Sequence, residues 1–180
     1  DIRNIIKTIP VHLGFIVFYE LSYPNLINFF KELNVPFEKS DMSFSVSIQD
    51  TNIEYGGRGL KAIFANKLNI FNLNFLKMIQ EIIFFYKNAP SLLKKNLEGE
   101  TLGSYLDKSN FSKYLIDYHI IPMVAAIWSM PLNKARDMPL ELFLKFFINH
   151  GLFKLKNRPQ WYTVSSRSRT YVEKALKSIS

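Results

Sequence analysis

The stretch LNFLKMIQEIIFFYK, residues 73–87, decides the fold of this chain. Its large apolar side chains recur every three or four residues, which places them along one wide face of an α-helix. Pro90 follows closely and is typical of a helix end, because proline has no backbone N–H to donate. The stripe begins a part of the chain that is predicted to be almost entirely helical. It consists of Phe75, Met78, Ile79, Ile82, Ile83 and Tyr86.

Further helices are predicted on both sides of this stretch. Proline is favoured in the first turn of a helix, and Ser or Thr just before it, because the first N–H groups of a helix have no partner within it. Such residues begin amphipathic or apolar segments at several places. The predicted helices begin at Pro24 (ending at Asn34), Thr101, Ser112, Met123 (ending at Trp128), Pro139 (running through Phe147 to a stop at Gly151) and Ser168 (ending at Ser178).

The predicted strands are short and lie toward the two ends. Met42–Ile48 alternates apolar and serine residues, and Ile53–Tyr55 can return beside it as a hairpin. Leu13–Phe18 is uniformly apolar, as expected of a buried strand, and Trp161–Val164 is a further strand. We therefore predict the α+β class.

The chain is long and apolar enough to bury a core. It has 180 residues, of which 48% are hydrophobic, so we expect one domain or a part of a larger one. Three portions are predicted within it. They are a strand, helix and hairpin portion at 1–56, a helical portion at 57–157, and a return strand and helix at 158–180.

Several kinds of chemistry are disfavoured by what the sequence lacks. With no cysteine, it offers no disulfide or thiolate site, and its three histidines are too far apart in sequence to suggest a metal site. Neither a nucleophile triad nor paired carboxylates can be recognised, so no residue is assigned as catalytic. Residues 57–62 match G-x-G-x-x-A, but the preceding strand is short and half polar, which favours a glycine turn over a dinucleotide fingerprint. Any reaction would need a borrowed cofactor.

The net charge of +8 is compatible with anionic partners, but the lysines are dispersed along the chain. A Lys-, Asn-, Ile- and Phe-rich composition is also what an AT-rich genome tends to encode. Because no basic stripe alternates with aromatic residues, we expect no nucleic-acid binding. The longest apolar run, Ile120–Leu132, contains two prolines and is too short to cross a bilayer. We expect a soluble, cytoplasmic protein.

Five blocks of sequence carry a resemblance to a known family. In chain order they are VHLGFIVF at 11–18 with YPNL at 23–26 and ELNV at 32–35, then SDMSF at 40–44, IPM at 121–123 with AIWS at 126–129, NHGL at 149–152, and RPQW at 158–161. Together they resemble the flavin-containing amine oxidase family, in the bacterial branch of NAD/FAD-binding amine oxidoreductases. The resemblance spans almost the whole chain.

The resemblance implies the substrate-domain portion of an FAD-dependent oxidoreductase with an FAD/NAD(P)-binding amine-oxidase-type fold. Gly14 and Phe15 match the strand that passes the flavin ring. The flavin would accept a hydride from a largely apolar small-molecule substrate. A pocket bordered by Phe85, Met123, Trp128 and Phe143 would hold that substrate, although such aromatic side chains are more often plain core.

In the family, a Rossmann unit that precedes these residues holds the ADP half of the cofactor. We therefore expect weak FAD binding or none from this chain alone, and self-association through exposed apolar surface. The alternative is a non-enzymatic module that binds an apolar ligand or a protein partner and has lost the nucleotide-binding half. Three positions depart from the family. His12 stands where the family has an acidic residue, and Tyr19 stands where it has an asparagine. Residues 166–168 (Ser-Arg-Ser) stand where the family has a Gly-Gly-Ser turn.

Overall fold

The computed structural model describes residues 17–49, 51–165 and 167–179. They form two compact units. Unit 1 combines the residues up to Met42 with those from Pro159 onward, and unit 2 is the continuous segment Ser43–Arg158. Unit 2 is therefore inserted in the sequence between the two halves of unit 1.

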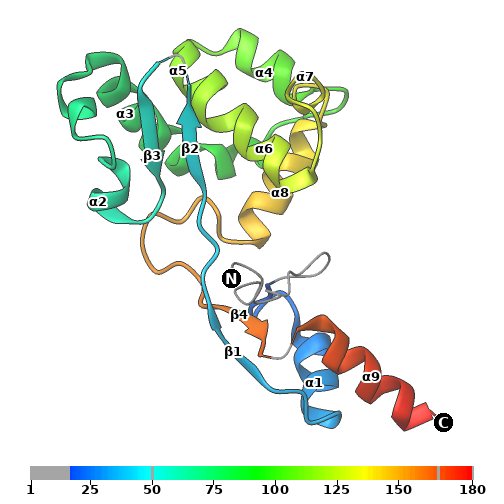
Figure 1. The fold of residues 1–180 in the computed structure, drawn as a ribbon. Helices are drawn as coiled ribbons and strands as arrows, with labels where there is room; N and C mark the ends of the chain where they lie inside the picture. Colours follow the sequence, from blue (N-terminus) through cyan, green and yellow to red (C-terminus); the bar gives the residue numbers. More distant parts are fainter. Residues whose placement is uncertain (1–16, 50, 166, 180) are drawn as a thin grey trace, which may run out of the picture. The chain divides into compact units, whose positions relative to one another are not determined.

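Unit 1 pairs two strands from opposite ends of the chain and covers them with helices (Figure 1). Strand β1 (Phe37–Ser40) runs antiparallel to β4 (Trp161–Val164), with Phe37 opposite Val164 and Ser40 opposite Trp161. Helix α1 (Pro24–Glu32) precedes β1, and α9 (Ser168–Ile179) follows β4. The small hydrophobic core of unit 1 comprises Phe18, Ile27, Phe30, Val35 and Val164.

Unit 2 begins with a hairpin and continues as helices (Figure 1). In the hairpin, β2 (Ser45–Ile48) pairs antiparallel with β3 (Ile53–Gly56). The long amphipathic segment of the sequence becomes α3 (Leu73–Asn88). The other elements are α2 (Gly59–Ile63), η2 (Lys67–Phe71), η3 (Ala89–Lys94), α4 (Leu102–Lys108), α5 (Lys113–Leu115), η4 (Ile116–Ile120), α6 (Ile121–Trp128), α7 (Leu132–Ala135) and α8 (Leu140–Asn149).

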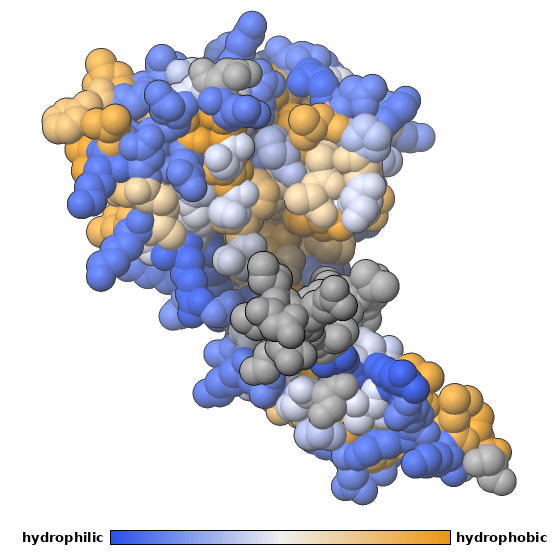
Figure 2. Space-filling model, in the orientation of Figure 1, coloured by the Kyte–Doolittle hydropathy of each residue, from blue (hydrophilic) through white to orange (hydrophobic). Residues whose placement is uncertain are grey.

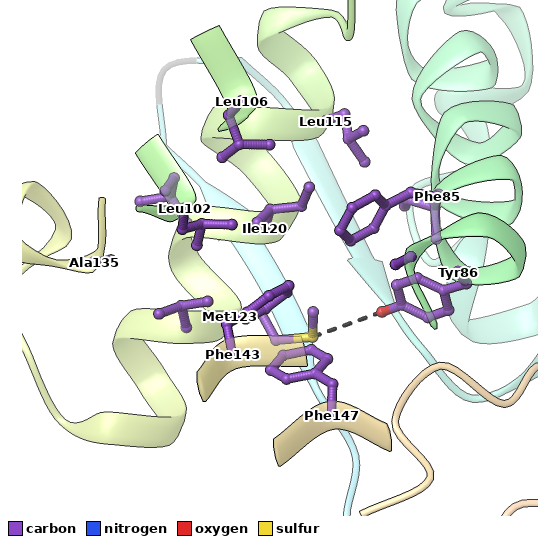
Figure 3. Packing of buried hydrophobic residues seen from close by; sticks show 14 of the residues in the cluster. Phe85, Tyr86, Leu102, Leu106, Leu115, Ile120, Met123, Ala135, Phe143 and Phe147 are labelled. Atoms are coloured by element: carbon purple, nitrogen blue, oxygen red, sulfur yellow. Dashed lines mark hydrogen bonds between the residues drawn. The ribbon is translucent and has the colours of Figure 1, made fainter. Parts of the chain in front are cut away.

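The core of unit 2 is built around α3 and α8 (Figure 3). Phe85 of α3 and Phe143 of α8 are fully buried, with stacked rings whose centroids lie 6.3 Å apart. Phe147 lies one turn along α8, 4.3 Å from the Phe143 ring centroid. Side chains four residues apart share a helix face, so the apolar stripe of the sequence becomes the inner face of each helix.

The path from α5 to α6 contains one π-helical turn, η4. The N–H of Ile121 donates to the carbonyl of Ile116, five residues earlier, instead of the carbonyl four residues earlier. Pro122 follows in the first turn of α6. Proline has no N–H, and its ring would clash with the carbonyl four residues before it, which is that of Tyr118. A widened turn at this point accommodates the proline.

The predicted α+β class is confirmed as a mixture of helices and short antiparallel strands. The predicted hairpin, the α3 stretch and helix beginnings at Pro24, Thr101 and Ser112 are confirmed within one residue. Pro90 ends the α-helix, but the chain continues through it as the 3-10 turn η3. The hairpin belongs to unit 2, together with the helices. The predicted portions grouped it with residues 1–56 instead, apart from the helical portion 57–157.

No helix within the described ranges is both long and apolar enough to cross a membrane.

Candidate functional site

Unit 2 contains a buried cluster of three polar aromatic side chains. Tyr55 comes from β3, Tyr86 from the last turn of α3, and His119 from the π-helical turn η4. The Tyr55 hydroxyl lies 2.9 Å from His119 Nδ1, and the Tyr86 hydroxyl lies 2.9 Å from His119 Nε2. All three side chains are buried, and His119 is only 6% exposed. The imidazole is thus held at both nitrogens.

The direction of each hydrogen bond follows from the donors available. Tyr55 donates its single hydroxyl proton to the backbone carbonyl of Tyr118, at 2.7 Å. Its oxygen must then accept from His119 Nδ1, which places the imidazole proton on Nδ1. Nε2 is left as the acceptor, and Tyr86 donates to it. The sulfur of Met123, at 3.7 Å, is a second and weaker acceptor for Tyr86 (Figure 3).

The Tyr118 carbonyl accepts the last hydrogen bond of this network, and it is available because of the local sequence. In an α-helix the N–H of residue 122 would donate to the Tyr118 carbonyl, and residue 122 is proline. Tyr55 supplies a hydroxyl in place of that missing N–H. An unpaired carbonyl that is shielded from water costs up to about 1–3 kcal/mol, so the bond from Tyr55 to this part-buried carbonyl stabilises the π-helical turn.

Burial sets the charge state of the network. Desolvation, together with the smaller effect of the nearby positive charge of Arg158, lowers the pKa of His119 to about 3. Burial also raises the pKa of Tyr86 well above its usual range, which the charge of Arg158 partly offsets. The pKa of Tyr55 is raised chiefly by burial and secondarily by Tyr86. All three groups are therefore neutral at physiological pH.

Arg158 also fixes the backbone beside the network. Its Nε donates to the carbonyl of Lys154 at 2.8 Å, and its Nη1 donates to the carbonyl of Gly57 at 3.2 Å. It thereby joins the turn that follows β3 to the segment that follows α8. The chain that carries Tyr55 is held in place from both sides of the core.

A neutral network of this kind orients groups and does not exchange protons. A general acid or base works best with a pKa near the operating pH, whereas His119 stays unprotonated far below it and both tyrosines stay protonated. The network can hold β3, α3 and η4 in one fixed arrangement.

Three of the four predicted pocket residues lie in the core around this network. Phe85 and Phe143 are fully buried and stacked, and Met123 contacts the Tyr86 hydroxyl (Figure 3). Phe153 packs against both rings, at 5.8 Å and 6.0 Å between centroids. Core packing is therefore a sufficient role for these side chains, and their contact with a substrate stays a prediction.

The fourth, Trp128, ends α6 and is half-buried. Its ring lies 4.6 Å from that of Phe146 and 6.3 Å from that of Phe147, between centroids. It therefore joins the same aromatic cluster from the outer side. The predicted flavin contacts, Gly14 and Phe15, lie outside the described residues.

A groove of about 490 Å³ lies elsewhere on unit 2. It is open and is formed by the outer side of α3, the end of α4 and the loop after α4. Phe84, Tyr105 and Phe111 give it aromatic walls, and Lys95 and Lys108 stand at its rim. The groove and the predicted pocket are thus built from different residues.

Sequence reasoning missed Tyr55, Tyr86 and His119 as a group. Its spacing places Tyr86 on an apolar stripe, and the sequence indicates neither a metal site nor a catalytic partner for His119. One local signal was available: Pro122 stands three residues after His119 inside an apolar helical run, so a carbonyl there needs another donor. The donor itself is 63 residues away in sequence.

Neither the family models nor the curated proteins that were compared with the sequence gave a match. Over the described part of the chain, the acidic and histidine side chains form no cluster that could hold a metal ion.

Proposed function

We propose that this chain is the substrate-binding portion of an FAD-dependent, amine-oxidase-type oxidoreductase. In this proposal a hydride passes from a largely apolar substrate to the flavin. The observation that carries it is the inserted unit: the helical segment Ser43–Arg158 interrupts a small α/β unit. The resemblance of the sequence blocks implies the same order, with a strand, a helical substrate portion and a return strand.

The turn after β4 gives further support. Arg167 stands where the resemblance expects the second glycine of a Gly-Gly-Ser turn, and its φ is +72°. This is the left-handed region that favours glycine. A glycine at position 167 would fit this φ without strain, so the backbone at this one residue is compatible with the expected glycine.

FAD would supply the redox chemistry when bound, as electron acceptor. The residues of this chain would bind and orient the substrate and exclude water from it. The neutral Tyr55–His119–Tyr86 network is consistent with that division, because hydride transfer to a flavin needs no proton-exchanging residue from the helical unit. By resemblance, Gly14 and Phe15 would lie beside the ring.

The test is flavin binding by the protein produced from its complete reading frame. We expect the absorbance spectrum to show bound FAD. In the absence of oxygen, an apolar amine or another apolar hydride donor should bleach the flavin absorbance. Gly14→Val should abolish flavin binding. Gly57→Ala should not, because its added Cβ would meet only ordinary contacts, the nearest being the Phe44 carbonyl at 3.6 Å.

Two results would contradict the proposal. One is a protein that carries no flavin and whose spectrum is unchanged by added FAD. The other is loss of flavin in Gly57→Ala but not in Gly14→Val, which would assign the nucleotide site to the glycine turn instead. A colourless protein that still binds an apolar dye would favour the alternative, a non-enzymatic apolar-ligand module.

A further inference from the structure

Between α2 and the start of α3, unit 2 exposes several large apolar side chains, which we call the apolar edge. Phe71 and Leu73 are 84% and 80% exposed, the values of side chains with almost no cover. Orange side chains stand out among blue ones on the left of unit 2, where α2 and α3 lie (Figure 2). The edge consists of Leu60 in α2, Leu68, Ile70 and Phe71 in η2, and Leu73 at the start of α3.

The geometry of η2 points these side chains outward together. A 3-10 helix has three residues per turn, so Leu68 and Phe71 lie on the same side. Asn69 between them is only 3% exposed, and its Nδ2 donates to the Glu54 carbonyl at 3.1 Å. The polar residue is therefore inside and the apolar residues are outside, the reverse of the pattern that a core produces.

Two other asparagines fix the ends of η2. The Asn66 side chain accepts from the Leu68 N–H at 3.0 Å and donates to the Asn52 carbonyl at 2.7 Å. The Asn72 side chain accepts from the Phe75 N–H at 3.1 Å and so begins α3. The apolar edge is thus held in a defined shape by hydrogen bonds.

The charge on the segment that forms the edge is mainly positive. Between Gly56 and Gln80 the sequence contains Arg58, Lys61, Lys67 and Lys77 and neither Asp nor Glu, while Glu54 precedes the segment and Glu81 lies 3.9 Å from Lys77 Nζ. Lys61 and Lys67 are exposed and flank the apolar side chains directly in sequence. Two copies of this edge would bring like charges together, so its charge favours an anionic partner over self-association.

We propose that the apolar edge docks onto an anionic lipid surface. Leu68, Phe71 and Leu73 would enter the interfacial region of the bilayer, and Lys61 and Lys67 would contact the lipid head groups. Exposed apolar side chains beside lysines are the composition that binds at such interfaces. This proposal is independent of the flavin chemistry proposed above.

The test is co-sedimentation of the full chain with lipid vesicles. We expect binding to vesicles of phosphatidylcholine mixed with phosphatidylglycerol, much weaker binding to phosphatidylcholine alone, and release by salt. The double variant F71S/L73S should weaken binding about 100-fold, from about tenfold for each apolar side chain. K61Q/K67Q should weaken it about 25-fold, from about fivefold for each lysine.

The matched control is L132S/L142S, which removes two exposed leucines of the same unit outside the edge and should bind like the original chain. Circular dichroism establishes that each variant is folded. The proposal is overturned if F71S/L73S binds as well as the control, or if neutral and anionic vesicles bind the chain equally. It is also overturned if light scattering shows that F71S/L73S only breaks up an oligomer while no form binds vesicles.

Discussion

At the scale of single residues, the direction of the hydrogen bonds around His119 predicts which of two substitutions lowers the stability more. Tyr55→Phe leaves two groups without their Tyr55 partner, the buried His119 Nδ1–H and the part-buried Tyr118 carbonyl. Tyr86→Phe leaves only His119 Nε2. Because each such group costs about 1–3 kcal/mol, we expect Tyr55→Phe to lower the free energy of unfolding more than Tyr86→Phe. Urea unfolding of both variants measures the difference.

Tyr105→Phe is the control for this pair, since it removes a half-buried hydroxyl outside the network. It should cost less than either variant. Equal losses for Tyr55→Phe and Tyr86→Phe would contradict this ranking.

The low pKa of His119 predicts a loss of stability in mild acid. The unfolded chain binds a proton at His119 below about pH 6.5, whereas the folded chain does so only near pH 3. Between these values the unfolded state holds more protons, so stability falls as the pH falls, by about 1.4 kcal/mol per pH unit. From pH 7 to pH 5 we expect a decrease of about 2 kcal/mol, measured by urea unfolding.

His119→Gln should remove this part of the pH dependence, while His150→Gln should leave it unchanged. If His119→Gln does not fold, the imidazole NMR signals of the original protein serve instead. A His119 ring that titrates near pH 6 in the folded protein would contradict the prediction.

The packing role of many single residues was predictable, but the network was not. Phe75, Met78 and Tyr86 share a helix face by their spacing alone, and all three are buried. Tyr55, Tyr86 and His119 meet only because three separate elements pack together. Local spacing contains no information about such long-range contacts.

At the scale of elements, the turn between β4 and α9 contains a strained residue. Arg167 has a φ of +72°, which costs a residue with a Cβ roughly 1–2 kcal/mol. Arg167→Gly removes this strain, but glycine is more flexible in the unfolded chain by about 0.4–1 kcal/mol. We expect a net gain of about 0.5–1 kcal/mol, seen as a higher urea midpoint.

Arg167→Ala is the matched variant, because it removes the same side chain but keeps the Cβ. It should give no gain in stability. Equal gains for alanine and glycine would assign the effect to the arginine side chain instead of the backbone.

Most elements were predictable because the residues at their ends are typical of helix beginnings and ends. Thr101 caps α4 by accepting from the Ser104 N–H at 3.1 Å, and Pro24 occupies the first turn of α1. Strand β1 was not predicted: Phe-Glu-Lys-Ser has little apolar alternation. It is a strand because β4 pairs with it, and a single-sequence pattern does not reveal that partner.

At the scale of the whole molecule, unit 2 has a continuous sequence and its own core. We therefore expect a chain of residues 43–158 to fold by itself. It should retain helical circular dichroism and a cooperative urea transition. A fragment that binds hydrophobic dye and loses helicity gradually would show that unit 2 depends on unit 1.

A shorter fragment, residues 43–149, tests which contacts matter. It lacks Phe153, which lies 5.4 Å from Tyr86 and 5.2 Å from Phe147 between ring centroids, and Arg158, which holds the turn at Gly57. We expect it to be less stable by about 3–5 kcal/mol, the usual cost of removing a buried phenylalanine. Equal stability of the two fragments would contradict the role given to this segment.

The pairing of β1 with β4 also bears on how the protein is made. A ribosome releases Phe37–Ser40 early, but the strand that pairs with it, Trp161–Val164, emerges only after the whole of unit 2. Unit 2 can therefore fold on the ribosome while β1 still has an unpaired edge. During that interval residues 37–40 lack their partner strand, and their backbone N–H and C=O groups are open to pairing with other chains.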